Sequence, residues 1–316
     1  MIFNRAIIYI SMVFALGAHA GGQVSARWPL ASFTGRVMNA VSSLNFYGPT
    51  PGFHHGLDIE APALSEVYAP VSGKIAARYY YPPHPSNYTF EISITELGGK
   101  RWELHHIDKS TIPAEILAMA EAGEEIDAGT YLGRVFDGRV YEVASHLHIN
   151  VLIDGFYHEP QLFLPLPQDQ IAPQFKRIFI LGGNGVREIN NLELKRDELT
   201  VDSVLLVEAF DQGQVSKLPV YSFQVVESGS SRPFFSFNFA NLPFADFLKG
   251  VEEFYHLPEV VLGSGEKLKS NPDQFFYRVP LKDLSKAASA MDFVVKDIQG
   301  NSARLTLSIY PSSLSK

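Results

Sequence analysis

Residues 53–62 read FHHGLDIEAP, a short strand-like stretch that contains two histidines and an aspartate. A strand that only fills a core does not need these side chains. Because successive side chains of a strand point to opposite faces, the pattern predicts His54, Gly56 and Asp58 on one face. The other face takes His55, Leu57 and Ile59. If that second set faces a core, His54 and Asp58 point away from it together. Gly56 then leaves a gap in which an imidazole and a carboxylate can hold an ion.

Two more groups of histidines follow along the chain. His146 and His148 flank a leucine, so in a strand the two imidazoles share one face while the leucine points into the core. In residues 102–107 (WELHHI), alternation separates His105 from His106 without showing which of them belongs to a site. A single pair of this kind would be read as exposed or hydrogen-bonded histidines. Three groups in one β-rich region favour a metal or catalytic site.

Together these motifs resemble the lysostaphin/LytM-type zinc endopeptidases. The resemblance covers roughly residues 28–166, and its motifs are His54-x-Gly56-x-Asp58, His105-His106-Ile107 and His146-Leu147-His148. Supporting stretches are Trp28-Pro29, residues 67–75 (VYAPVSGKI) and residues 125–133 (EIDAGTYLG). The order and spacing of the whole set are more specific than any one motif.

The resemblance implies roles for five residues. It implies that the metal ligands are His54, Asp58 and His148. It implies that the catalytic histidines are His106 and His146. The choice of His106 over His105 depends on Ile107, because the family's catalytic histidine directly precedes a leucine-like residue.

The resemblance further implies a secreted zinc-dependent endopeptidase that hydrolyses peptide cross-links of bacterial peptidoglycan, with Zn²⁺ as cofactor and peptidoglycan as partner. Two imidazoles and one carboxylate leave a fourth zinc position open. The main alternative is a non-catalytic or self-blocked cell-wall-binding module that regulates other wall hydrolases. Such modules can lose metal ligands, whereas all five polar positions are present in this sequence. An amidase or esterase with the same metal chemistry is a further alternative.

Three features depart from the family pattern. Residues 142–145 (EVAS) stand where a glycine-containing run usually precedes the His-x-His motif. Residues 79–88 (YYYPPHPSNY) and a helix predicted at 112–122 are additions. These differences concern the substrate groove and not the metal ligands.

Composition narrows the class of protein. The chain has 316 residues, 46% hydrophobic and 19% charged, which is typical of a globular protein with a substantial core. Its net charge of −8 and the lack of a basic run argue against a nucleic-acid partner. Because the chain has no cysteine, disulfides and thiolate ligands are excluded, and any metal site uses His, Asp or Glu. We expect a monomer.

The first 20 residues have the order of a secretory signal peptide. Arg5 precedes an apolar stretch from Ala6 to Leu16, and Ala18-His19-Ala20 matches a cleavage signal. The apolar stretch is too short to cross a bilayer core of about 30 Å. We therefore expect a mature chain without a membrane span, located in the periplasm or outside the cell.

The remaining sequence predicts a mainly β protein with two domains. Residues 21–166 are predicted to form an antiparallel, lysostaphin-like β-sheet peptidase domain with one short helix at 112–122. Residues 167–173 read as a proline-containing linker. Residues 174–316, with strand-like runs at regular spacing, predict an immunoglobulin-like β-sandwich with a short helix within 244–254. We expect this sandwich to bind the cell wall or a partner, or to position the peptidase domain.

Overall fold

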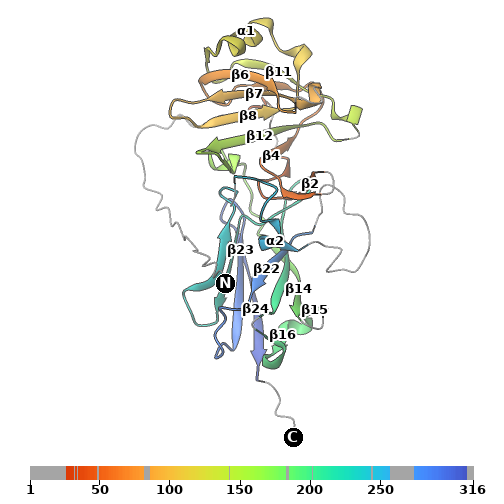
Figure 1. Ribbon diagram of the computed structural model, residues 1–316, viewed down its shortest axis with the longest axis vertical. Helices are drawn as coiled ribbons and strands as arrows, with labels where there is room; N and C mark the ends of the chain where they lie inside the picture. Colours follow the sequence, from red (N-terminus) through yellow and green to blue (C-terminus); the bar gives the residue numbers. More distant parts are fainter. Residues whose placement is uncertain are drawn as a thin grey trace, which may run out of the picture.

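The computed structural model describes residues 26–311, except 32, 34, 48–49, 82–85, 142, 183–184, 201, 243–244 and 257–273. The predicted signal peptide, residues 1–20, lies outside the described residues. Within the described part of the chain, no helix combines the length and hydrophobicity needed to cross a membrane. In Figure 1 the sheets of the N-terminal half lie above those of the C-terminal half.

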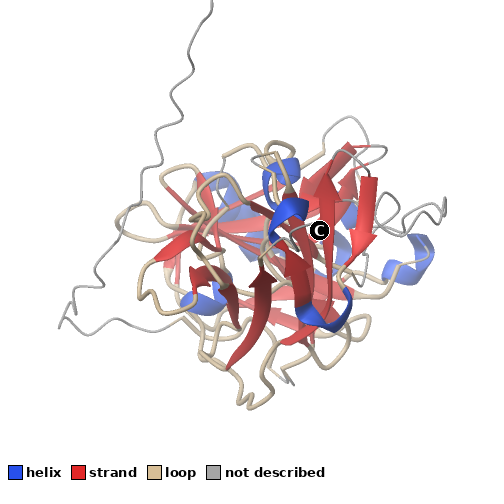
Figure 2. Cartoon of the chain, turned by 90° about the horizontal axis from the view of Figure 1, so that it is seen from below, coloured by secondary structure: helices blue, strands red, loops and turns tan. Residues whose placement is uncertain are grey.

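The chain is mainly β, as the sequence predicts, and strands dominate the view in Figure 2. The strands of the N-terminal half are β1 (Val37–Asn39), β2 (Leu44–Tyr47), β3 (Thr50–Phe53), β4 (Leu57–Glu60), β5 (Glu66–Tyr68), β6 (Gly73–Tyr79), β7 (Phe90–Thr95), β8 (Arg101–His105), β9 (Ile107–Asp108), β10 (Glu125–Ile126), β11 (Tyr131–Val135), β12 (His146–Ile153) and β13 (Phe156–His158). The main sheet is antiparallel and runs β1-β4-β12-β8-β7-β6-β10, with β13 beside β12. A smaller sheet runs β5-β11-β9, and β2 pairs with β3.

The register of the main sheet aligns polar residues in one row. β12 lies between β4 and β8, and His148 pairs with Asp58 on one side and with His105 on the other. The row continues to Asn39 on β1 and to Glu91 on β7. Strand pairing therefore brings together residues that are distant in the sequence.

The side chains that alternate with this polar row fill a core. The fully buried members on the central strands are Leu57, Ile59, Ile92, Leu104, Leu147 and Ile149. The helix α1 (Ala114–Ala122) packs beside β6. It follows Pro113 and ends at Gly123, whose φ of 65° is the left-handed conformation that commonly ends a helix. The prediction of a helix within 112–122 is confirmed.

The C-terminal half is a sandwich of two sheets. Its strands are β14 (Gln174–Gly182), β15 (Gly185–Glu188), β16 (Glu193–Lys195), β17 (Val204–Gln212), β18 (Lys217–Leu218), β19 (Ser222–Glu227), β20 (Pro233–Asn238), β21 (Tyr255–His256), β22 (Phe276–Pro280), β23 (Ala290–Lys296) and β24 (Ser302–Tyr310). One sheet runs β15-β14-β17-β22-β21 and the other β16-β24-β23-β19-β20. Val207 and Tyr277 of the first sheet share a core with Phe223 and Phe293 of the second. Among the described residues, the helix predicted within 244–254 is confined to α2 (Val251–Phe254).

Short 3₁₀ turns complete the described elements. They are η1 (Asn87–Thr89), η2 (Lys109–Thr111), η3 (Gly138–Tyr141), η4 (Pro160–Leu162), η5 (Asn190–Leu192) and η6 (Arg196–Glu198).

The β2–β3 hairpin connects the two halves by packing. Leu44 and Phe53 are buried in the core of the C-terminal sandwich, although both precede β4 in the sequence. The ring of Phe53 lies 6.1 Å from that of Tyr255, and its backbone N–H donates a hydrogen bond to the carbonyl of Phe247. Figure 1 shows β2 between the upper sheets and the sandwich. The sandwich therefore holds the segment that leads directly into the FHHGLDIEAP stretch.

Two of the predicted strands are interrupted. The stretch 53–62 is not one strand, because residues 54–56 between β3 and β4 are irregular. The strand predicted over 101–107 ends at His105, and His106 has a left-handed backbone with a φ of 64°. Strict alternation therefore does not hold at either place, and both interruptions lie at the predicted site.

Candidate metal centre

Three of the five predicted site residues direct one donor atom each toward a common point. His54 Nε2 lies 3.1 Å from His148 Nδ1 and 3.2 Å from Asp58 Oδ2. His148 Nδ1 lies 2.7 Å from Asp58 Oδ1. All three residues are buried. They come from the loop after β3, from β4 and from β12, so the register of the main sheet brings them together.

His54 and His148 each direct one ring nitrogen to a hydrogen-bond acceptor outside this group of three. His54 Nδ1 is 3.2 Å from the carbonyl oxygen of Ala40, which can only accept. His148 Nε2 is 2.7 Å from Oδ1 of Asn150, which is also an acceptor. In the neutral form each ring therefore donates outward and turns its second nitrogen toward Asp58.

The charge of Asp58 completes the group. Burial disfavours an ionised carboxylate, but the imidazoles of His54 and His146 outweigh burial and hold the pKa of Asp58 well below its usual value. The amide of Asn39 donates a hydrogen bond of 2.8 Å to Asp58 Oδ2 and fixes the carboxylate. Two imidazole lone pairs and a carboxylate thus face one another in a buried space, an arrangement that a cation stabilises.

This donor set fits zinc. Two imidazole nitrogens and one carboxylate oxygen, with no thiolate, are a ligand set that zinc uses in open sites. The donor spacings of 2.7 to 3.2 Å are close to the ligand–ligand edge of about 3.3 Å expected for tetrahedral zinc with ligands at about 2.0–2.1 Å.

A second group of possible metal ligands lies further along the polar row but is already neutralised. Glu91, Glu103 and His105 have donor atoms within 4.8 Å of one another. Arg78 pairs with Glu91 at 2.5 Å, and Arg101 pairs with Glu103 at 2.8 Å. Because its carboxylates have cationic partners, this group has less need of a metal ion than the first.

The two predicted catalytic histidines lie beside the first group. The ring centroids of His106 and His146 are 4.7 Å apart, and His146 Nε2 is 3.8 Å from Asp58 Oδ1. The Nδ1 of each ring is 2.7 Å from a backbone carbonyl, that of Tyr88 for His106 and that of Ala144 for His146. Each Nδ1 therefore donates to its carbonyl, so that in the neutral ring Nε2 is the acceptor.

His106 is held in place by its backbone and by a tyrosine. Its ring stacks on that of Tyr88 at 4.0 Å with an interplanar angle of 13°. Burial, and then the imidazoles of His146 and His148, hold the pKa of His106 well below its usual value. His106 is therefore neutral at pH 7 and available to accept a proton.

Strand alternation predicts that His55 points away from the site, but in the structure it does not. Its ring lies 5.1 Å from that of His148 and stacks at 4.5 Å on Phe247 of the C-terminal half. Its Nδ1 is 3.1 Å from the hydroxyl of Tyr47. The reason is the irregular backbone at 54–56, which frees His55 from the alternation of β4. His55 forms part of the wall beside the candidate ligands.

Asn150 and Glu103 hold His148 in position. The sequence pattern did not single out either residue. Asn150 donates from Nδ2 to Glu103 Oε2 at 3.0 Å, which leaves its Oδ1 to accept from His148. Burial disfavours the charge of Glu103, but hydrogen bonding from His105 lowers the pKa of Glu103 to about 2. Alternation offered a signal for Asn150, because positions 146, 148 and 150 share one face of β12.

The gap predicted beside Gly56 is filled by atoms of neighbouring residues. A Cβ at position 56 would lie 2.3 Å from Asn150 Oδ1, 2.5 Å from the carbonyl oxygen of Ile149 and 2.7 Å from His148 Nε2. The glycine thus lets the hydrogen bond between His148 and Asn150 form directly beside the chain.

Gly56→Ala is expected to weaken zinc binding by about 10- to 100-fold, the usual cost of disturbing a partner of a metal ligand. The added methyl group displaces the hydrogen bond between His148 and Asn150. Competition with a chromogenic zinc chelator measures the effect. Gly182→Ala is the matched control, because a Cβ there makes only an ordinary contact of 3.7 Å with Ser203. Equal zinc affinities of the two variants would contradict this role of Gly56.

Comparison with known proteins gives partial similarities. No family model matches the chain, and no curated protein matches it. Among solved structures, the catalytic domain of the antimicrobial peptidase lysostaphin from Staphylococcus simulans is similar at 26% identity, with a TM-score of 0.27. The match covers 37% of this chain and 86% of that domain. Lysostaphin, which the motifs resemble, is thus among the proteins of known structure that this chain is similar to.

Two further solved structures are similar. Csd3 from Helicobacter pylori is 18% identical with a TM-score of 0.34, and the match covers 46% of this chain and only 36% of Csd3. A chain from the SpoIIQ–SpoIIIAH pore-forming complex is 15% identical with a TM-score of 0.35, and the match covers 45% of this chain and 92% of that chain. Because each match takes in less than half of this protein, function is argued from the side chains of the site.

Proposed function

We propose that this protein is a zinc-dependent endopeptidase that hydrolyses peptide cross-links of bacterial peptidoglycan. One observation carries the proposal: His54 Nε2 and His148 Nδ1 converge on the carboxylate of Asp58, and two further imidazoles lie next to them. His54 Nε2, His148 Nδ1 and the Asp58 carboxylate would hold the metal. The motifs that resemble the lysostaphin/LytM-type enzymes support the choice of a peptide substrate.

The positions of the two remaining histidines support a role in amide hydrolysis. When bound, Zn²⁺ supplies a Lewis acid that lowers the pKa of a water molecule and polarises an amide carbonyl. His106 and His146 each hold one ring proton on a backbone carbonyl and can accept another at Nε2. The ring that accepts the proton of the water at Nε2 would pass it on to the leaving amine, and the other ring, when it carries a proton at Nε2, would donate a hydrogen bond to the oxyanion.

Export is part of the proposal. Peptidoglycan lies outside the cytoplasm, so its hydrolysis requires a protein that reaches the periplasm or the cell surface. The signal peptide predicted over residues 1–20 would direct that export.

One observation favours a self-blocked resting state. All five proposed site residues are largely buried, with only 11% of the His146 side chain exposed. Phe247 of the C-terminal half stacks on His55 next to His148. In this variant of the proposal, the sandwich limits access to the peptidase site, and the chain acts after the contact opens or regulates other wall hydrolases.

Defined muropeptides test the proposed reaction. The zinc-loaded chain is incubated with cross-linked muropeptide dimers, and mass spectrometry identifies the products. We expect each dimer to give two monomers with a new amino and a new carboxyl terminus, and a chelator to stop the reaction. Release of the whole peptide from the sugar would identify an amidase instead.

Binding to peptidoglycan with no cleavage, by both the wild type and Phe247→Ala, would favour the regulatory module. Cleavage by Phe247→Ala alone would favour the self-blocked state.

A further inference from the structure

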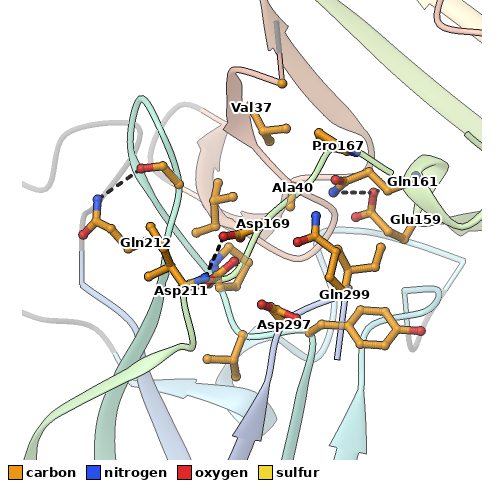
Figure 3. A pocket seen from close by; sticks show the side chains of 18 of the residues that line it. Val37, Ala40, Glu159, Gln161, Pro167, Asp169, Asp211, Gln212, Asp297 and Gln299 are labelled. Carbon is orange, nitrogen blue, oxygen red and sulfur yellow. Dashed lines mark hydrogen bonds between the residues drawn. The ribbon is translucent and has the colours of Figure 1, made fainter. Parts of the chain in front are cut away.

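A separate polar cluster lies where the segment between the two halves meets the sandwich. Carboxylate oxygens of Asp169, Asp211 and Asp297 lie within 4.8 Å of one another. Asp169 belongs to the segment before β14, Asp211 to β17, and Asp297 follows β23 directly. Figure 3 shows the three aspartates beside one another, and all three line a cavity of about 440 Å³. The cluster contains no residue of the proposed zinc centre.

The cluster contains a buried oxygen that lacks a partner. Asp211 is only 8% exposed, and its Oδ1 is buried without a hydrogen bond. Gln299, which lines the same cavity, also has a buried Oε1 without a partner. An unpaired carboxylate oxygen inside a protein is costly unless a cation or a donor satisfies it.

Three carboxylates gather here with few cationic neighbours among the described residues. Lys282 aside, no described lysine, arginine or histidine forms an ion pair with any of the three carboxylates. Burial, and then the charges of Asp297 and Asp169, raise the pKa of Asp211 to about 7. Three acidic groups therefore share a partly enclosed space in which at least one of them is disfavoured as an anion.

We propose that this cluster is a binding site for a Ca²⁺ ion. The donors of the cluster are the oxygens of three carboxylates, which is the donor type that calcium prefers. Calcium takes six to eight oxygen ligands in a flexible geometry, so waters in the cavity can complete its shell. The ion satisfies the unpartnered oxygen of Asp211 and removes the repulsion between the aspartates.

The site would fasten the segment before β14 to the sandwich. Asn301 already links two of the aspartates: its Nδ2 donates to the carbonyl oxygen of Asp169 at 3.2 Å and to the carboxylate of Asp297 at 2.7 Å. A calcium ion adds β17 to this connection through Asp211. Calcium binding would thus stabilise the junction between the two halves without taking part in hydrolysis.

Calcium titration of the zinc-loaded full chain tests the site. Isothermal titration calorimetry is expected to show one calcium per chain, and saturating Ca²⁺ is expected to raise Tm by about 3 °C or more. Mg²⁺ should shift Tm less, because it gives up its waters reluctantly. His148→Ala should keep the full calcium response, since it alters only the zinc centre.

Two variants make the test specific. Asp211→Asn removes one charge, so without calcium its Tm should equal or exceed that of the wild type, and its calcium response should be lost. Asp169→Asn, on the segment before β14, should weaken calcium binding at least tenfold. Asp283→Asn, an exposed aspartate elsewhere, is the matched control and should behave as the wild type. Absence of heat and of a Tm shift in the wild type would overturn the proposal, as would an unchanged calcium response in Asp211→Asn.

Discussion

Replacing His148 with alanine is expected to abolish zinc binding and muropeptide cleavage together. His148 is the central residue of the polar row, where it meets Asp58 on β4 and His105 on β8. Disturbing a partner of a metal ligand costs about 10- to 100-fold in affinity, so removing a ligand should weaken zinc binding by more than about 100-fold. Chelator competition measures the affinity, and elemental analysis measures the zinc content.

His158→Ala is the control for this change. His158 lies on β13, next to β12, and packs against Phe163 rather than against the site. It should keep zinc and activity. Circular dichroism should show a folded His148→Ala chain, because the neighbouring core residues Leu147 and Ile149 are untouched. A folded His148→Ala protein with full zinc content would remove His148 from the ligand set.

Replacing His106 with asparagine is expected to separate zinc binding from catalysis. Asparagine tolerates the left-handed backbone of position 106, where φ is 64°, but cannot serve as a base near neutral pH. His106 lies next to His146 and outside the group formed by His54, Asp58 and His148. We therefore expect zinc content to remain and kcat to fall by about 10²- to 10⁴-fold.

His105→Asn is the comparison for His106→Asn. His105 supports Asn150 and Glu103 in the polar row, so its loss should lower zinc affinity more than it lowers the kcat of the zinc-loaded protein. Normal kcat in His106→Asn together with an inactive, zinc-loaded His105→Asn would reverse the assignment within this pair.

Much of the fold follows from local patterns. The strand on which His146 and His148 share a face, and the helix predicted within 112–122, both lie where the sequence predicts them. These elements depend on contacts close in the sequence, which is why pattern and turn chemistry predict them.

The features that the sequence does not predict are those that depend on contacts between residues far apart in the chain. The irregular backbone at 54–56 and the left-handed His106 place His55 and His106 against alternation. The hairpin residues Leu44 and Phe53 enter the core of the C-terminal sandwich, which no local pattern indicates. The contacts of Asn39 with Asp58 and of Asn150 with Glu103 depend on strand order in the sheet, which a single sequence does not specify.

Anomalous diffraction at the zinc absorption edge, from crystals of the zinc-loaded protein, tests the central claim most directly. We expect one strong anomalous peak within bonding distance of His54 Nε2, His148 Nδ1 and the Asp58 carboxylate, with His106 and His146 beside it but not bound to it. A peak at Glu91, Glu103 and His105 instead, or no peak from protein shown to contain zinc in solution, would contradict the assignment.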